Sequence, residues 1–236
     1  MKIGVKNVVK NIANAIFPER GRGCGAIGGF LCERCKKYIS ENVLVREIDE
    51  RGEFLRAEYL GFRDEILGEM VEECKYAPAR GLAAEIAEVV WQGYFERCNS
   101  PLILVPMPTS RKHVRERGFD HMDLIGRGIE RYSDGVVRRL RLLERAKDTA
   151  QVGASSEVRW KQAKEAVRVN EKVLEEFLKS DFKGEVVLID DVWTTGASML
   201  EAGRMLKEAG VTNLVALAIT KNRSRRRPVI RRGEID

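Results

Sequence analysis

The sequence predicts an α/β fold with a mostly parallel central sheet flanked by helices. Two short apolar runs, 102–105 (LILV) and 186–189 (VVLI), have the aliphatic composition expected of strands buried on both faces of a parallel sheet. Helical stretches alternate with the strands, and residues 184–219 form a strand–helix–strand pattern. This alternating order is typical of α/β proteins whose sheet is mainly parallel.

Length and charge indicate an ordinary globular protein. The 236 residues suffice for one sizeable core with a small appended module, and 44% of them are hydrophobic and 33% charged. The formal net charge is +6, but residues 221–236 alone carry seven Lys or Arg against two acids. The rest of the chain is therefore close to neutral, and overall basicity does not by itself indicate nucleic-acid binding.

Residues 1–17 predict an amphipathic helix whose apolar face packs on the body of the protein. Three lysines interrupt this segment, so it contains no continuous apolar core of a secretory signal. No run reaches the roughly 18 apolar residues of a membrane-spanning helix. With five cysteines, an odd number, we expect a reducing, cytoplasmic setting and no membrane partner.

A cysteine knuckle follows, formed by Cys24 and the C-x-x-C pair Cys32 and Cys35. Such a pair lets two thiolates bind one tetrahedral zinc. A second pair would need a cysteine at position 21, which is glycine. Three thiolates therefore remain, and a structural zinc would need a fourth ligand from Cys74, His113 or an acidic side chain. A metal-free remnant and a redox pair are the alternatives.

The first half of the chain predicts a hairpin and two helices before the first buried strand. Residues 43–60 alternate around the turn signal 49–52 (DERG), which is typical of two antiparallel strands. Residues 62–74 and 80–98 have helical periodicity, the second with a stripe of apolar residues. The strand 102–105 then leads into a Pro-rich turn, and a helix is expected to open at 117–119 and run to about 132.

The second half predicts strands and helices in alternation. We expect strands over 136–143 and 166–169, a helix over 157–165, and a final unit with a strand over 184–189, a helix over 197–209 and a strand over 211–219. Between them, 145–156 (RAKDTAQVGASS) is polar and flexible in composition. A loop carrying Arg145, Lys147, Thr149 and Gln151 suits a lid that excludes water, and a plain exposed hairpin is the alternative.

A basic segment follows the strand 102–105. Ligands of open α/β sheets bind at the carboxyl ends of strands, so this segment delivers cations to a ligand position. Arginine can bind a pyrophosphate through two parallel hydrogen bonds. A solvated basic loop is the alternative. The candidate pyrophosphate-binding residues are Pro108, Thr109, Ser110, Arg111, Lys112 and Arg117.

The stretch 185–200 (EVVLIDDVWTTGASML) is the most informative part of the sequence. Its apolar run ends in Asp190 and Asp191, and then Thr194, Thr195 and Gly196 precede a helix. Loop amides and a helix N-terminus favour a phosphate. The two acids would repel it, so they suit hydrogen bonds to sugar hydroxyls or a place near a divalent cation. This combination fits a ribose 5-phosphate, with an ordinary strand–turn–helix as the alternative.

The string VVLIDDVWTTGAS resembles the phosphoribosyl-pyrophosphate (PRPP) signature of type I phosphoribosyltransferases. The resemblance extends to the ComF family, phosphoribosyltransferase-like proteins associated in bacteria with DNA uptake. It includes the cysteine knuckle, Lys75-Tyr76, VPMPTS at 105–110, RERGFDHM at 115–122 and residues 142–170. It implies a type I phosphoribosyltransferase fold over 61–220, an N-terminal helix, knuckle and hairpin over 1–60, and a basic tail over 221–236.

The resemblance also implies a reaction: transfer of a phosphoribosyl group from PRPP, with Mg²⁺, to a nitrogenous acceptor with release of pyrophosphate. It places Asp190 and Asp191 on the ribose hydroxyls and assigns catalysis to them with Arg145 and Lys147. The residues expected to wrap the 5-phosphate are Val192, Thr194, Thr195, Gly196, Ala197 and Ser198. The expected partners are PRPP and its acceptor, with a homodimer as a further candidate.

A non-catalytic PRPP-binding protein, or an accessory protein of DNA uptake or recombination, is the alternative function. Its basic tail would contact a phosphate backbone, although a solvated tail is the simpler interpretation. The sequence also departs from the family pattern Arg-Gly-Phe-Asn-Gln, because Asp120 and His121 follow Phe119 here. His121 is interpreted either as a helix-surface residue or as a catalytic group.

Overall fold

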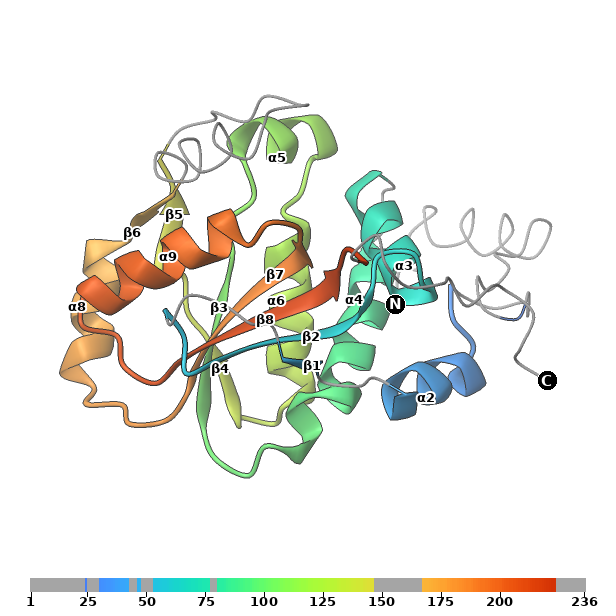
Figure 1. Cartoon of the computed structure of the whole chain (residues 1–236), viewed down its shortest axis with the longest axis horizontal. Coiled ribbons are helices and arrows are strands. Elements are labelled where there is room, and N and C mark those ends of the chain that lie inside the picture. The colour runs from blue at the N-terminus through green and yellow to red at the C-terminus, as the bar shows by residue number, and fades with distance from the viewer. Residues whose placement is uncertain are drawn as a thin grey trace, which may run out of the picture.

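A six-stranded sheet in the order β1-β2-β8-β7-β3-β4 forms the centre of the protein (Figure 1). The structure, a computed structural model, describes residues 24, 30–42, 46–47, 53–76, 80–146 and 167–223. In this sheet β2, β8, β7, β3 and β4 are parallel to one another, and β1 pairs with β2 in the antiparallel direction. The strands are β1 Arg46–Glu47, β2 Arg56–Phe62, β3 Leu102–Pro106, β4 Val137–Arg139, β7 Val186–Trp193 and β8 Leu214–Lys221.

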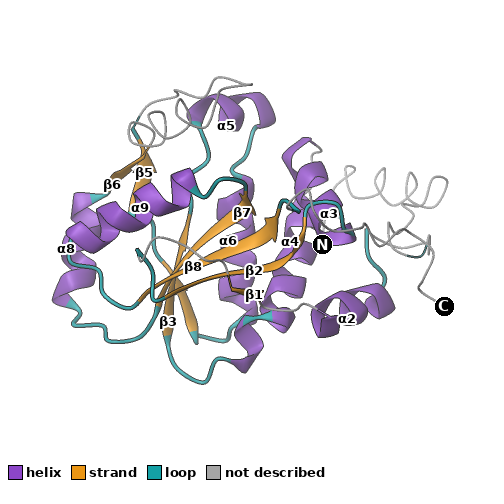
Figure 2. Ribbon diagram, in the orientation of Figure 1, coloured by secondary structure: helices purple, strands orange, loops and turns teal. Residues whose placement is uncertain are grey.

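Helices cover both faces of the sheet, as Figure 2 shows. A small antiparallel pair, β5 (Leu143–Arg145) and β6 (Val167–Val169), lies beside them. The helices are α2 Glu33–Asn42, α3 Ile66–Tyr76, α4 Arg80–Gly93, the 3₁₀ turn η1 Phe95–Arg97, α5 Arg111–Arg117, α6 His121–Tyr132, α8 Glu171–Lys179 and α9 Ala197–Glu208. The predicted α/β class with a mostly parallel sheet is therefore confirmed.

Strand β7 contributes to two apolar cores because its side chains alternate between the faces of the sheet. Val187 and Ile189 pack in the core that contains residues of α3, α4 and α6. Val186 and Leu188 pack in the core under α8 and α9. All four side chains are buried, which explains why the run reads as continuously apolar in the sequence.

The carboxyl ends of β3 and β7 are neighbours. Pro106 is opposite Ile189 in the register, and the Met107 amide donates to the Ile189 carbonyl at 2.8 Å. The loop that leaves β3 therefore starts beside Asp190 and Asp191. This placement agrees with the rule that ligands of α/β sheets bind at the carboxyl ends of the strands.

Several element boundaries differ from the sequence-based expectation. Strand β7 continues through both acids to Trp193, because β8 pairs with it as far as Lys221. The basic segment after β3 forms the short helix α5 between the Ser110 cap and the left-handed Gly118, rather than a loop. Helix α6 starts later than predicted, at His121, because Asp120 caps it.

The predicted antiparallel pairing of the hairpin is present, because β1 pairs with β2, but the place of its second strand and the region before β7 differ from expectation. The second hairpin strand, β2, pairs in parallel with β8 and so belongs to the central sheet. Helix α8, capped by Asn170, was not predicted. The predicted helices 1–17 and 157–165, most of the loop 145–156 and the tail beyond residue 223 lie outside the described residues.

None of the described helices is both long enough and apolar enough to span a membrane.

Candidate functional site

The central feature of the candidate site is the carboxylate of Asp191 on β7. Its Oδ2 atom lies 2.9 Å from His121 Nε2 and 2.9 Å from Lys75 Nζ. Lys75 is also within 2.9 Å of Glu72 on the same helix, α3. The backbone carbonyl of Asp191 accepts a hydrogen bond from the buried Thr220 hydroxyl at 3.1 Å. Three elements, α3, α6 and β8, therefore hold this one residue.

The surroundings of Asp191 keep its side chain ionised. Burial works to raise its pKa, but the hydrogen bond from His121 and the charge of Lys75 outweigh burial and hold the pKa below its usual range. In turn, burial works to lower the pKa of Lys75, and Asp191 and Glu72 outweigh it and raise that pKa. The two groups form a mostly buried ion pair at neutral pH.

The pKa of the neighbouring Asp190 carboxyl is raised, whereas that of Asp191 is lowered. Burial and the negative charge of Asp191 raise its pKa to about 7, although the Asp191 amide donates to its Oδ1 at 2.9 Å. Successive strand residues point to opposite faces, so Asp190 lies on the face of α8 and α9 while Asp191 lies on the face of α3 and α6. Two adjacent acids thus differ in charge because they lie in different surroundings.

The predicted phosphate loop joins β7 to α9. Gly196 caps α9 with a left-handed φ of 75°, and a Cβ there would lie 2.4 Å from Trp193 Cζ2. The hydroxyl of Thr195 accepts from the Ala197 amide at 3.4 Å. Thr194, Thr195 and Ser198 are exposed, while Gly196 and Ala197 are buried and Val192 is half-buried. The loop therefore presents hydroxyl groups at the N-terminus of a helix.

The loop after β3 contributes Thr109, which is linked to the same site. Its hydroxyl donates to Asp120 Oδ1 at 2.8 Å and lies 3.5 Å from His121 Nδ1. Ser110 is buried, and its hydroxyl caps α5 by accepting from the His113 amide at 3.1 Å. Both hydroxyls are therefore engaged, and that of Thr109 also lies against the side chain that binds Asp191.

The remaining candidate cations vary in position. Arg111 and Lys112 are exposed on α5, and Lys112 lies 3.9 Å from Glu116. The Arg117 guanidinium lies over the Tyr76 ring, 5.5 Å from its centroid. Arg145 ends β5, and its charge acts on the Asp190 carboxyl to lower its pKa, as a minor contribution. Pro108 is half-buried. Lys147 lies outside the described residues.

Two site residues carry more weight in the structure than the sequence suggested. His121 is only 5% exposed, so the interpretation of it as a helix-surface residue was wrong. The sequence singled out Lys75 only as part of a resemblance, and its pairing with Asp191 was not predicted. The signal for His121 was available, since Asp120 is a favoured N-cap residue and the next position begins the helix. No local pattern indicated which strand α3 would approach.

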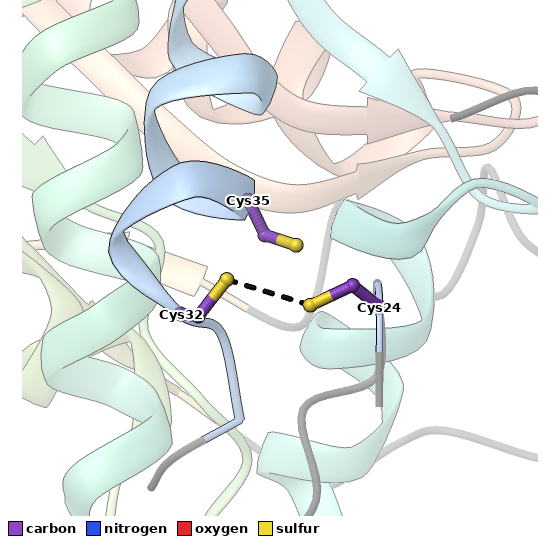
Figure 3. Close-up of side chains that lie close together, drawn as sticks. All are labelled: Cys24, Cys32 and Cys35. Carbon is purple, nitrogen blue, oxygen red and sulfur yellow. Dashed lines mark hydrogen bonds between the residues drawn. The ribbon is translucent and has the colours of Figure 1, made fainter. Parts of the chain in front are cut away.

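The cysteine knuckle forms a compact cluster in which three sulfur atoms point toward one another (Figure 3). The Sγ atoms of Cys24, Cys32 and Cys35 all lie within 4.8 Å of one another, with Cys24 and Cys32 3.5 Å apart. Among the described residues this group includes neither Cys74 nor His113, which together with an acidic side chain were the candidates for a fourth ligand. The cluster could hold a metal ion.

The thiols of this cluster have different acidities. Burial, with the neighbouring Cys24 and Cys32, raises the pKa of Cys35 to about 12. Hydrogen bonds from the Cys35 amide and the Cys24 thiol lower the pKa of Cys32. The segment before α2 is also anchored, because Glu85 on α4 accepts from the Leu31 amide at 2.8 Å.

These features define an α/β protein with a mostly parallel sheet, a polar site at the carboxyl ends of β3 and β7, and a separate cysteine cluster. The chain is similar to "Competence protein ComFC" of Bacillus subtilis (strain 168), with 30% identity over 108 residues. The match spans 46% of this chain and 39% of the relative, so it covers less than half of either protein. No protein-family model matches the chain.

Proposed function

We propose that this protein is a ComF-family, type I phosphoribosyltransferase-like enzyme. It binds PRPP and transfers the phosphoribosyl group to a nitrogenous acceptor, with release of pyrophosphate. The observation that carries the proposal is the ionised carboxylate of Asp191, held by Lys75 and His121 at the carboxyl end of β7. The hydroxyl-bearing loop 194–198 follows directly, and the resemblance of this stretch to the PRPP signature supports the same assignment.

Asp190 and Asp191 would bind the ribose hydroxyls. An ionised carboxylate is an acceptor with several lone pairs, which suits two neighbouring hydroxyl donors. Among the described residues, both partners of the Asp191 side chain bind Oδ2, so Oδ1 remains for a ligand. Asp190 would supply a second acceptor. Its pKa is raised to about 7, and a hydrogen bond from a bound hydroxyl would favour its ionised form at that pH.

The 5-phosphate would bind at the loop 194–198. The exposed hydroxyls of Thr194, Thr195 and Ser198 can donate to phosphate oxygens, and the N-terminus of α9 favours an anion. The left-handed Gly196 keeps the loop tight against Trp193, because any side chain there would meet the indole ring. The charge of Asp191 is compensated by Lys75, which reduces its repulsion of a nearby phosphate.

The pyrophosphate would lie toward the loop after β3 and helix α5, where Arg111, Lys112 and Arg117 supply positive charge. The atoms of the site that could bind a metal are mainly carboxylate and hydroxyl oxygens, which suit Mg²⁺. Magnesium bound to the pyrophosphate would neutralise charge on the leaving group. Arg145, at the start of the predicted lid segment, acts on Asp190 through its charge, which lowers the pKa of that carboxyl.

The chemistry requires positioning more than acid–base catalysis. A nitrogen lone pair of the acceptor forms a bond to the anomeric carbon while the bond from that carbon to pyrophosphate breaks, and the pyrophosphate leaves with the bonding electrons. Holding the sugar at two hydroxyls and one phosphate restricts the reacting carbon to one orientation. The acceptor nitrogen loses its proton to solvent water after the new bond forms.

Similarity to a protein named for competence favours a second candidate, a PRPP-binding accessory protein of DNA uptake. The two functions differ in turnover. Pyrophosphate release should be measured with PRPP, Mg²⁺ and a panel of purines, pyrimidines, ammonia and amines, for the wild type and Asp190→Asn/Asp191→Asn. Acceptor-dependent release that the double variant lacks supports the transferase, and PRPP binding without release across the panel supports the accessory role.

We also propose that the cysteine cluster binds one structural zinc ion. Zinc–thiolate bonds of about 2.3 Å in a tetrahedron place sulfurs about 3.8 Å apart. The 3.5 Å separation of Cys24 and Cys32 fits that value. A zinc ion would keep all three thiols deprotonated, including Cys35, whose pKa is otherwise raised by burial.

A further inference from the structure

The imidazole ring of His121 lies between the two loops of the proposed site. Its Nε2 is 2.9 Å from Asp191 Oδ2 on β7, and its Nδ1 is 3.5 Å from Thr109 Oγ1 in the loop after β3. The side chain is buried, with an exposed fraction of 6%. The ring therefore contacts one residue from each half of the site and is screened from solvent.

The backbone alone does not connect these two residues. Hydrogen bonds between β3 and β7 end where the Met107 amide donates to the Ile189 carbonyl. Thr109 and Asp191 each lie two residues beyond that bond. In the described part of the chain, the next connection between the two segments runs through the His121 ring.

We propose that His121 is a positioning residue that holds Asp191 and Thr109 in a fixed relation, so that the ribose and pyrophosphate ends of PRPP bind in register. This inference rests on the proposed function. It adds a role that the site residues themselves do not supply, because His121 acts through Asp191 and Thr109 and not on the ligand.

The hydrogen-bond partners assign the ring's donor. The ionised carboxylate of Asp191 can only accept, so Nε2 carries the proton of this bond. The hydroxyl of Thr109 donates to Asp120 Oδ1 at 2.8 Å, so it has no proton for Nδ1 and touches the ring by packing at 3.5 Å. Asp120 also caps α6 through the Asp123 amide at 3.1 Å. The cap of α6 thus fixes the position of the ring at the first residue of the helix.

The geometry separates a positioning role from simple packing. A glutamine side chain can donate to Asp191 with its amide nitrogen, although its shape differs from that of imidazole. A leucine fills similar space and cannot donate. Lys75 still binds Asp191 in both variants, so the carboxylate keeps a partner when the ring is replaced.

The first test is calorimetric titration of PRPP with Mg²⁺ into the wild type, His121→Gln and His121→Leu. We expect the leucine variant to bind about tenfold more weakly and the glutamine variant to bind within threefold of the wild type. A loss of less than threefold in the leucine variant overturns the inference. An equal loss in both variants also overturns it, because restoring a donor should restore binding.

The second test needs no ligand, so it remains informative if PRPP does not bind or the leucine variant does not fold. The chain contains two histidines, and His113→Gln assigns their signals in a ¹⁵N NMR spectrum of the imidazole rings. We expect the His121 ring to be protonated on Nε2 and its signals to shift in Thr109→Val. A ring protonated only on Nδ1, or one that does not respond to Thr109→Val, contradicts the inference. Failure of PRPP binding with this NMR result intact would reject the proposed function alone.

Discussion

Lys75 Nζ on α3 lies 2.9 Å from Asp191 Oδ2 on β7, and this ion pair joins a helix of one layer to the central sheet at the candidate site. Both side chains are largely buried, with exposed fractions of 15% and 16%. Removing one partner of a buried pair leaves an uncompensated charge. The pair therefore links the stability of the fold to the charge of the site.

Lys75→Met should destabilise the protein by about 3 kcal/mol, because Asp191 would lose its cationic partner. The measurement is denaturant unfolding at neutral pH. Lys37→Met is the matched control, since Lys37 is exposed and lies 3.8 Å from Glu41, and it should change stability by less than about 0.5 kcal/mol. Equal stability of the two variants would contradict the role given to Lys75.

Asp190→Asn should make the protein more stable at alkaline pH. Burial and Asp191 raise the pKa of Asp190 to about 7, so the folded state binds a proton that the unfolded state has already released between about pH 4 and 7. The contribution of Asp190 to stability is thus full below about pH 4 and is lost as the pH rises through 7. Asparagine keeps the acceptor for the Asp191 amide and removes the buried charge.

The measurement for this prediction is the free energy of unfolding at pH 5 and pH 8. The advantage of Asp190→Asn over the wild type should grow by about 2 kcal/mol between these values. Asp134→Asn, at an exposed residue, is the control and should show no such pH dependence. A constant difference between Asp190→Asn and the wild type across this range would reject the raised pKa.

Gly196→Ala should destabilise the protein more than Gly118→Ala. Both glycines have left-handed backbones, with φ of 75° and 80°, so each alanine is strained by about 1 kcal/mol. At Gly196 the added Cβ would also lie 2.4 Å from Trp193, whereas nothing lies within 4 Å of a Cβ at Gly118. Thermal unfolding of the two variants measures the difference, and similar losses would show that the indole ring moves aside freely.

The purified protein should contain about one zinc ion per chain, and Cys32→Ser should lose it. Elemental analysis by mass spectrometry measures the content, and a chelator should lower the unfolding temperature of the wild type and of Cys98→Ser but not that of Cys32→Ser. Cys98→Ser is the control, because Cys98 follows α4 in the sequence and is not part of the cluster. A metal-free wild type purified without chelators would count against the zinc site.

The central sheet could be predicted from the sequence because strands buried on both faces appear as continuous apolar runs. Val186–Ile189 is apolar on both faces, and the structure buries all four residues. The end of β7 was placed too early because Asp190 and Asp191 are polar, while the pairing that extends the strand comes from β8. The length of a strand depends on pairing with its neighbour, so it cannot be predicted from the strand's own residues alone.

The site could be predicted in its acids and loop but not in the residues that support them. Asp190, Asp191 and Gly196 lie in one contiguous motif, so their proximity follows from the chain itself. Lys75 and His121 reach the site from α3 and α6, and their contacts depend on how two helices pack against the sheet. Such long-range contacts have no periodic pattern in the sequence.

Calorimetric titration of PRPP with Mg²⁺ tests the central claim most directly. The wild type should bind, Asp190→Asn/Asp191→Asn should bind at least tenfold more weakly, and Asp134→Asn should bind like the wild type. Unfolding curves of all three proteins establish that the variants are folded. A folded wild type that does not bind PRPP, or a double variant that binds it equally well, would contradict the account.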